Sequence, residues 1–140
     1  MQQVFDINEL SVDRRQLSAP ALRKSRAWRY LSEADRTLLE LSERGLSCRL
    51  IGQAVGLNAG TVTRRLATIK ARLASPLARF ALDPTTALPE AARDVSLQYA
   101  ITGLRPAAIA RALNMSAAQV RDHLSFAQGV MRGASRRLHG

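Results

Sequence analysis

Apolar residues recur along this chain at the spacing of amphipathic helices, not in the alternation typical of strands. Between residues 31 and 75, three such stretches follow one another, separated by Gly45 and Gly56. Glycine at these points indicates a helix stop and a tight turn, because it adopts positive φ at little cost. Residues of the preferred N-cap type precede the stretches: Ser32, Ser47 and Asn58. The predicted apolar faces are Ala34, Leu38 and Leu41; Leu50, Ile51, Ala54 and Val55; and Val62, Leu66 and Ile69.

The same order of elements occurs a second time. Segment 51–62 aligns with 109–120, and upstream 31–36 aligns with 88–93. The second copy predicts helices at about 89–102, at about 106–113, and from after Ser116 to about Met131, with a stop at Gly103 and a turn at Asn114. A repeat of this kind decides the architecture. We therefore expect an all-α fold with two tandem helix-turn-helix units joined by a short linker.

Both copies carry the residue types that a helix-turn-helix requires. A small residue stands where the two helices cross, at Gly52 and at Ala110. A residue that tolerates positive φ stands in the turn, Gly56 or Asn114. Apolar anchors follow on the last helix: Val62 with Leu66, and Val120 with Leu124. The complete set occurring twice in register is much stronger evidence than any single member.

The pattern divides the chain into five parts. These are an N-terminal basic arm (1–30), unit one (31–75), a linker (76–87), unit two (88–131) and a basic tail (132–140). The linker has room for one turn of helix around Leu77 to Leu82. Ser75-Pro76 ends the third helix, because proline disfavours helix at the preceding residue. A short helix is expected after Pro20, with Trp28 among basic residues. Such an aromatic can stack on bases, but packing on the first repeat is the favoured interpretation.

Composition narrows the class of partner. A net charge of +10 and a pI near 11.4 favour a polyanion. No apolar stretch approaches the roughly 20 residues of a membrane span, so no membrane partner is expected. The single Cys48 excludes an internal disulfide, which fits a reducing cytoplasm. No phosphate loop, metal-ligand spacing or catalytic triad occurs, so we expect neither an enzyme nor a cofactor.

Unit one resembles the region-four domain of bacterial sigma factors. The stretches that carry the resemblance are Leu31 to Arg36, Gly45-Leu46-Ser47, and Gly56 to Val62. It is also similar to the related effector domain of quorum-sensing and response regulators. Unit two departs from the pattern at Asn114 and at Gln119-Val120. The resemblance implies promoter binding and a contact with RNA polymerase in bacterial transcription, but no segment resembles the sigma region that melts promoters.

In such units the N-terminal, exposed positions of the second helix meet base edges in the major groove. Arg64 is the predicted base contact, since a guanidinium can make two hydrogen bonds to guanine. Arg65, Lys70 and Arg72 are predicted to contact phosphates. Residues 58–82 contain five basic residues and no acidic one, whereas the first helix carries Glu33, Asp35, Glu40 and Glu43. The predicted DNA-binding residues of unit one are Asn58, Gly60, Thr61, Thr63, Arg64, Arg65, Lys70 and Arg72.

In unit two the equivalent DNA-binding residues are Ser116, Gln119 and Arg121. Asp122 lies beside them and would be repelled by phosphate, although a carboxylate can accept a hydrogen bond from cytosine. Unit two is therefore expected to bind DNA weakly, or to serve as a protein-contact or dimer module.

The sequence as a whole predicts a sequence-specific regulator of transcription that binds double-stranded DNA. Two alternatives stay open: a sigma-like accessory or inhibitory factor that binds RNA polymerase, and a bipartite DNA-binding protein of a phage or mobile element. A second copy of the chain and a second regulatory protein are further candidate partners.

Overall fold

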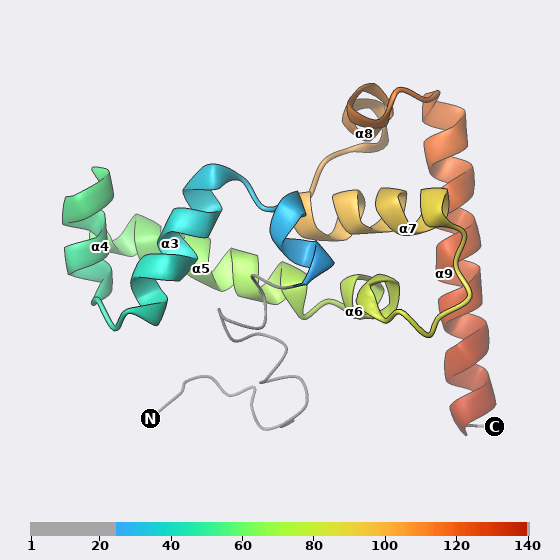
Figure 1. Cartoon of the computed structure of the whole chain (residues 1–140), viewed down its shortest axis with the longest axis horizontal. Helices are drawn as coiled ribbons and strands as arrows, with labels where there is room; N and C mark the ends of the chain where they lie inside the picture. The colour runs from blue at the N-terminus through green and yellow to red at the C-terminus, as the bar shows by residue number, and fades with distance from the viewer. Residues whose placement is uncertain (1–24, 140) are drawn as a thin grey trace. The chain divides into compact units, whose positions relative to one another are not determined.

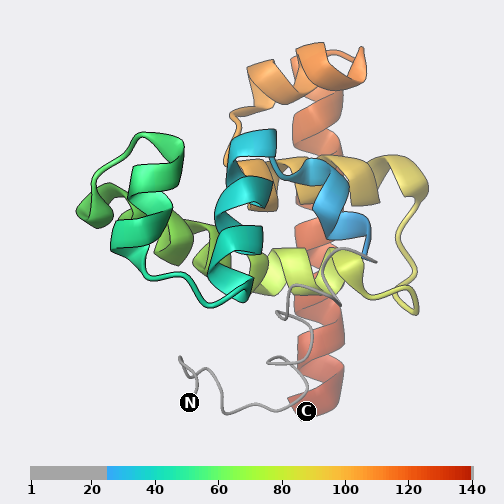
Figure 2. The ribbon, with the colours of Figure 1, turned by 60° about the vertical axis from the view of Figure 1, so that its left-hand side comes forward.

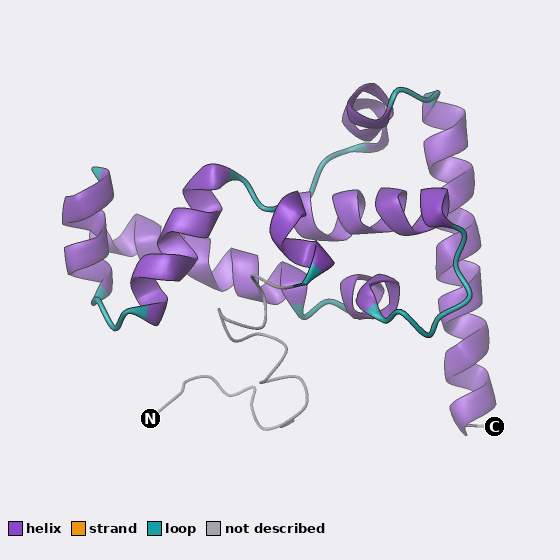
Figure 3. Cartoon of the chain, in the orientation of Figure 1, coloured by secondary structure: helices purple, strands orange, loops and turns teal. Residues whose placement is uncertain are grey.

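The computed structural model describes residues 25–139, and all secondary structure in this range is helical (Figure 3). The chain forms two compact units, with the boundary between Ala74 and Ser75. The predicted all-α class is confirmed. Residues 1–24, which include most of the predicted N-terminal arm with Arg23 and Lys24, lie outside the described range.

Within residues 25–74, the first unit forms a short 3₁₀ helix followed by three α-helices, whose order along the chain can be followed in Figure 1. The hydroxyl or amide oxygens of Ser32, Ser47 and Asn58 each accept a hydrogen bond from a backbone N–H in the first turn of the helix that follows. Gly45 and Gly56 both have positive φ, at 90° and 80°. The predicted caps and turns are therefore confirmed. The elements are η2 (Arg26–Tyr30), α3 (Glu33–Glu43), α4 (Cys48–Val55) and α5 (Ala59–Leu73).

The buried faces of α3 and α4 differ from the expected ones. Helix α3 contacts both α4 and α5, so its buried residues are Leu38 and Leu39, while Ala34 is exposed. Helix α4 has only two turns, and Ile51 and Gly52 are its buried residues. Leu50 and Ala54, which were expected on the inner face, are exposed. The predicted anchors of α5, Val62, Leu66 and Ile69, are all buried, and the structure adds Leu73 to them.

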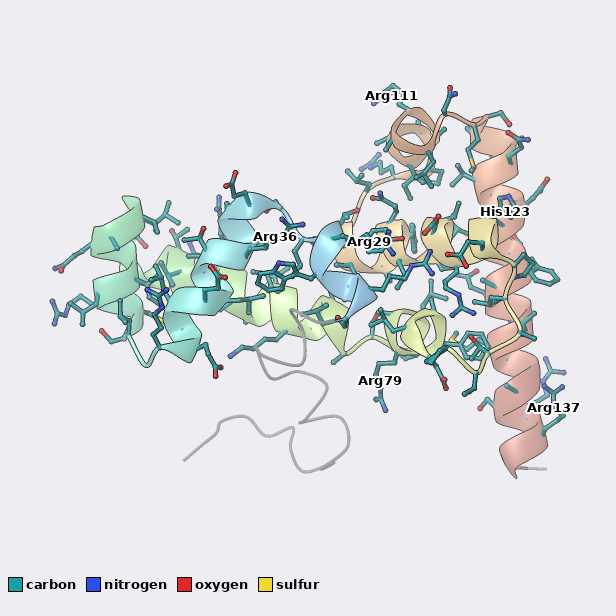
Figure 4. The ribbon with its side chains drawn as sticks, viewed as in Figure 1. Arg29, Arg36, Arg79, Arg111, His123 and Arg137 are labelled. Carbon is teal, nitrogen blue, oxygen red and sulfur yellow. The ribbon has the colours of Figure 1, made fainter. Side chains whose placement is uncertain are left out.

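Trp28 contacts α3 within the first unit. It lies in η2, and the Nε of Arg36 in α3 donates a hydrogen bond to its carbonyl oxygen at 3.0 Å. The guanidinium of Arg36 also lies 5.7 Å from the centre of the Trp28 ring, within the range of a cation–π contact (Figure 4). Trp28 is half-buried and its ring is in contact with Arg36. These contacts favour the interpretation that Trp28 packs on the first repeat over the one in which it stacks on bases.

The second unit begins earlier and ends later than the sequence predicts. Helix α6 (Pro76–Leu82) lies inside the predicted linker, yet Leu77, Ala78 and Ala81 are buried and α6 contacts α7 (Glu90–Leu97). Residues 76–82 are therefore part of the unit. The last helix, α9 (Ala117–His139), continues through the predicted basic tail. Between them lie the π-helix η3 (Gln98–Thr102) and α8 (Pro106–Leu113). Figures 1 and 2 show α9 running past α8, α7 and α6.

The π-helix η3 coincides with a change of register between the two repeats. Arg93 follows Arg36 by 57 positions, whereas Gly103 follows Gly45 by 58. The second copy is therefore one residue longer than the first between Arg93 and Gly103. A π-helix accommodates one extra residue within a helix by widening one turn. The helix stop at Gly103, with φ of 75°, is thereby retained.

Arg93 connects the elements at the start of the second unit. Its side chain is buried, and its Nη1 donates to the carbonyl oxygens of Ala81 at 2.6 Å and Asp83 at 3.0 Å. Its Nη2 donates to the carbonyl oxygen of Thr86 at 2.9 Å. In the loop that follows α6, the hydroxyl and the N–H of Thr85 donate hydrogen bonds to the Asp83 carboxylate. These hydrogen bonds hold the pKa of Asp83 below its usual value. Arg93 thus joins the C-terminus of α6 and the following loop to α7.

We expect Arg93→Ala to lower the free energy of unfolding by about 2 kcal/mol, because buried carbonyl oxygens lose charged donors. Chemical denaturation followed by circular dichroism measures the change. Arg111→Ala is a matched control, since Arg111 is exposed on α8 and should alter stability by less than about 0.5 kcal/mol. Equal stability of the two variants would show that Arg93 does not support the fold.

Candidate nucleic-acid interface

The turn between α4 and α5 is tightly built around Gly52. Its carbonyl oxygen accepts hydrogen bonds from the N–H groups of Gly56 at 2.8 Å and Leu57 at 2.9 Å. A Cβ at position 52 would lie 2.2 Å from the carbonyl oxygen of Leu57. No side chain fits at that distance, so this turn demands glycine where the two helices cross.

Helix α5 is held by one face and exposes the other. Asn58 caps its N-terminus, with Oδ1 accepting from the N–H of Thr61 at 2.8 Å. The buried residues Val62 and Leu66 fix the rotation of the helix, so that positions on the opposite side face outward. These outward positions include Gly60 and Arg64, both exposed. The structure therefore places Gly60 and Arg64 together on the outward face, while Asn58 caps the helix and Thr61 is half-buried.

Arg64 lies in the middle of this outward face. Its Nη2 donates to the hydroxyl of Thr61 at 3.2 Å, so its side chain folds toward the N-terminus of α5. Its Nη1 lies 3.5 Å from the position of a Cβ on Gly60, and the absence of that atom leaves the backbone beside the guanidinium uncovered. The hydroxyl of Thr63 donates to the carbonyl oxygen of Ala59 at 3.0 Å and is engaged within the helix. Of the polar residues at this end, Arg64 has the longest reach.

The charge of α5 is entirely positive. Its charged residues are Arg64, Arg65, Lys70 and Arg72, and it contains no acid. Arg65 and Arg72 are exposed and lie two helical turns apart on one flank, while Lys70 is half-buried on the other. The acidic first-turn residues Glu33 and Asp35 belong to α3. An outward arginine with basic residues on both flanks is the arrangement expected of a surface that meets phosphates.

The second unit has an equivalent helix pair with a different turn. Asn114 has φ of 57° and its N–H, like that of Met115, donates to the carbonyl oxygen of Ala110. Here the crossing residue carries a Cβ, which this turn accommodates. Ser116 and Gln119 form a reciprocal cap: the Ser116 N–H donates to Gln119 Oε1 at 2.9 Å, and the Gln119 N–H donates to Ser116 Oγ at 3.1 Å.

This cap engages two of the three residues predicted to contact DNA in unit two. Arg121 is exposed, as predicted, and so is Asp122 beside it. The structure adds two exposed basic residues from the preceding helix, Arg105 at its N-cap and Arg111 near its C-terminus (Figure 4). Sequence reasoning missed both because it considered only the last helix. The position of Arg111 opposite the buried Ile109 on an amphipathic helix was the available signal for that residue.

Within residues 25–139, no group of three or more His, Cys, Asp and Glu side chains is arranged to hold a metal ion. No helix in this range has the length and apolarity to span a membrane. Comparisons with known protein families, with curated proteins and with solved structures find no match to this chain.

Proposed function

We propose that the protein binds double-stranded DNA with sequence specificity and regulates transcription, with α4 and α5 acting as a helix-turn-helix. The observation that carries the proposal is the outward face of α5, where Arg64 lies beside the bare backbone of Gly60. All charged residues of that helix are basic. Such a face lets a helix approach the major groove closely and neutralises phosphates along its rims.

Each residue has a distinct role in this proposal. The Arg64 guanidinium, already directed toward the N-terminus of α5, makes two hydrogen bonds to one guanine. Arg65 and Arg72 contact phosphates on one side of the groove, and Lys70 contacts them on the other. Asn58 keeps its capping bond and fixes the first turn of the helix against the DNA. In the absence of DNA, the Thr61 hydroxyl accepts a hydrogen bond from the Arg64 guanidinium. This hydrogen bond breaks when Arg64 binds the base.

The second unit contributes general affinity in this proposal. Ser116 and Gln119 cap their own helix, which removes polar groups that would otherwise meet bases. Arg105, Arg111 and Arg121 are exposed and suited to phosphates. Asp122 lies where phosphate would repel it. Base reading is therefore assigned to unit one.

The experiment separates base contacts from phosphate contacts. A preferred duplex is first selected from random sequences, and binding of each variant to that site and to a random duplex is then measured by fluorescence anisotropy. Arg64→Ala should lose about 1–3 kcal/mol on the selected site, with preference relaxed at one base pair. Lys70→Ala should weaken binding to both duplexes about equally.

Arg44→Ala is the charge-matched control. Arg44 is exposed at the C-terminus of α3, beside the acidic residues of that helix. Its loss should leave the preference for the selected site unchanged. Absence of any binding to duplex DNA at low salt would refute the proposed function. If Arg64→Ala weakens both duplexes to the same degree, the assignment of the base contact is wrong.

A further inference from the structure

A line of five residues runs along the outward side of α9, opposite its buried residues Val120, Leu124 and Ala127. Successive members are three or four positions apart, so they lie on one face of the helix. We call this line the outer stripe of α9. Its members are Asp122, Phe126, Gly129, Gly133 and Arg137.

The two glycines of the stripe are not explained by contacts inside the described chain. A Cβ at Gly129 would have nothing within 4 Å, and one at Gly133 would meet only Nη1 of Arg137 at 3.8 Å. Neither glycine has positive φ. In a helix interior, glycine destabilises the helix relative to alanine. Bare backbone on a helix surface allows another helix to approach closely.

The stripe also exposes a large aromatic side chain. Phe126 is 50% exposed to solvent. Gly129 follows it within one helical turn. In Figures 1 and 2 the C-terminal end of α9 extends beyond α6 and α7, the helices of its own unit that pack on its middle. The stripe therefore presents an exposed aromatic ring and uncovered backbone on the same face.

The stripe is complementary to itself when reversed. Asp122 is the only acidic residue of α9. The midpoint between Asp122 and Arg137 falls between Gly129 and Val130, so the two charged residues are equally distant from it. Phe126 and Gly133 are likewise equidistant from that midpoint. If a second α9 lies antiparallel to the first about this midpoint, Asp122 of each helix lies opposite Arg137 of the other. The two opposite-charge pairs are then about 22 Å apart along the helices. The same arrangement also brings each aromatic ring opposite a glycine.

We propose that a second copy of this chain packs antiparallel along the outer stripe of α9, around a two-fold axis between Gly129 and Val130. Phe126 of each copy lies over Gly133 of the other, and Asp122 of each pairs with Arg137 of the other. An isologous two-fold contact of this kind is the commonest form of homodimer. The pairing is independent of the proposed function, and it gives Asp122 a partner that DNA would not provide.

One helix pair covers less than the roughly 800 Å² per partner of a standard interface. The dimer is therefore expected to form reversibly, with a dissociation constant on the order of micromolar. Sedimentation velocity of the full chain without DNA, over a concentration series, measures it. Because no DNA is present, the result does not depend on the proposed function.

Charge reversal tests the orientation of the pair. Asp122→Arg places arginine opposite arginine, and Arg137→Asp places acid opposite acid, at both ends of each homodimer. Each variant alone should self-associate at least about tenfold more weakly than the unmodified chain. An equimolar mixture of the two should recover the original association, since the heterodimer restores both opposite-charge pairs.

Arg132→Asp is the matched control, because Arg132 is exposed on α9 but lies on another side of the helix. It makes the same charge change as Arg137→Asp and should leave association unaltered. Gly133→Leu should abolish the dimer by filling the space for Phe126 of the second copy. Circular dichroism confirms that each variant is folded. A monomer at all concentrations, or a mixture that stays monomeric, would overturn the proposal.

Discussion

Raising the salt concentration from about 50 to 200 mM is expected to weaken DNA binding about fortyfold if only the first unit contacts DNA. Three basic side chains of α5 are assigned to phosphates, Arg65, Lys70 and Arg72. With a slope of about −0.9 per phosphate contact, the total slope is about −2.7, so a fourfold rise in salt costs between one and two orders of magnitude. The driving force is the release of counterions, so the effect should be similar for selected and random duplexes.

The same titration tells whether the second unit contributes. If Arg105, Arg111 and Arg121 also contact phosphates, the slope steepens to about −5 and the loss approaches roughly two-thousandfold. The triple variant with alanine at these positions should then return the slope to about −3. A flat response to salt would contradict electrostatic binding altogether, whichever unit is involved.

Gly52→Ala is expected to lower the free energy of unfolding of the first unit by about 3 kcal/mol. The added Cβ would lie 2.2 Å from the Leu57 carbonyl oxygen, which is backbone and cannot rotate away. The turn must open, and the paired hydrogen bonds to the Gly52 carbonyl oxygen weaken with it. DNA binding should fall in parallel, because the N-terminus of α5 follows directly after this turn.

Ala110→Gly is the matched variant in the second unit. Position 110 occupies the equivalent crossing but already holds a Cβ, so its loss should cost only about 1 kcal/mol. Thermal and chemical denaturation of both variants, followed by circular dichroism, provide the comparison. If Gly52→Ala proves as mild as Ala110→Gly, the close approach at the first turn does not limit stability.

Local features of the fold could be predicted from the sequence. The caps at Ser32 and Asn58 and the positive φ of Gly56 and Asn114 depend on chemistry within a few residues, and all four were predicted correctly. The inclusion of α6 in the second unit depends instead on contacts between residues far apart in the sequence, such as the hydrogen bond from Arg93 to the Ala81 carbonyl oxygen. The residue pattern within 76–87 does not predict that hydrogen bond, because its donor lies outside the segment.

The candidate interface shows the same division. That Arg64 faces outward follows from its spacing relative to Val62 and Leu66, which the sequence shows directly. Its hydrogen bond to Thr61 depends on a side-chain conformation that spacing cannot provide. Likewise, Ser116 and Gln119 were identified by position as DNA contacts, but their mutual hydrogen bonds arise only once the helix end is formed.

The π-helix η3 has a practical consequence for hybrid proteins that exchange reading helices between the two copies. Before residue 98, equivalent positions of the two copies differ by 57 in number, whereas after η3 they differ by 58. A hybrid whose junction lies before residue 98 therefore has a first helix that is one residue too short or too long for the helix pair that follows. In a regular helix, one residue turns everything beyond it by about 100°. A junction placed at Gly45 and Gly103 avoids this rotation, because both glycines end their helices and share the later offset of 58 with the helix pair that follows.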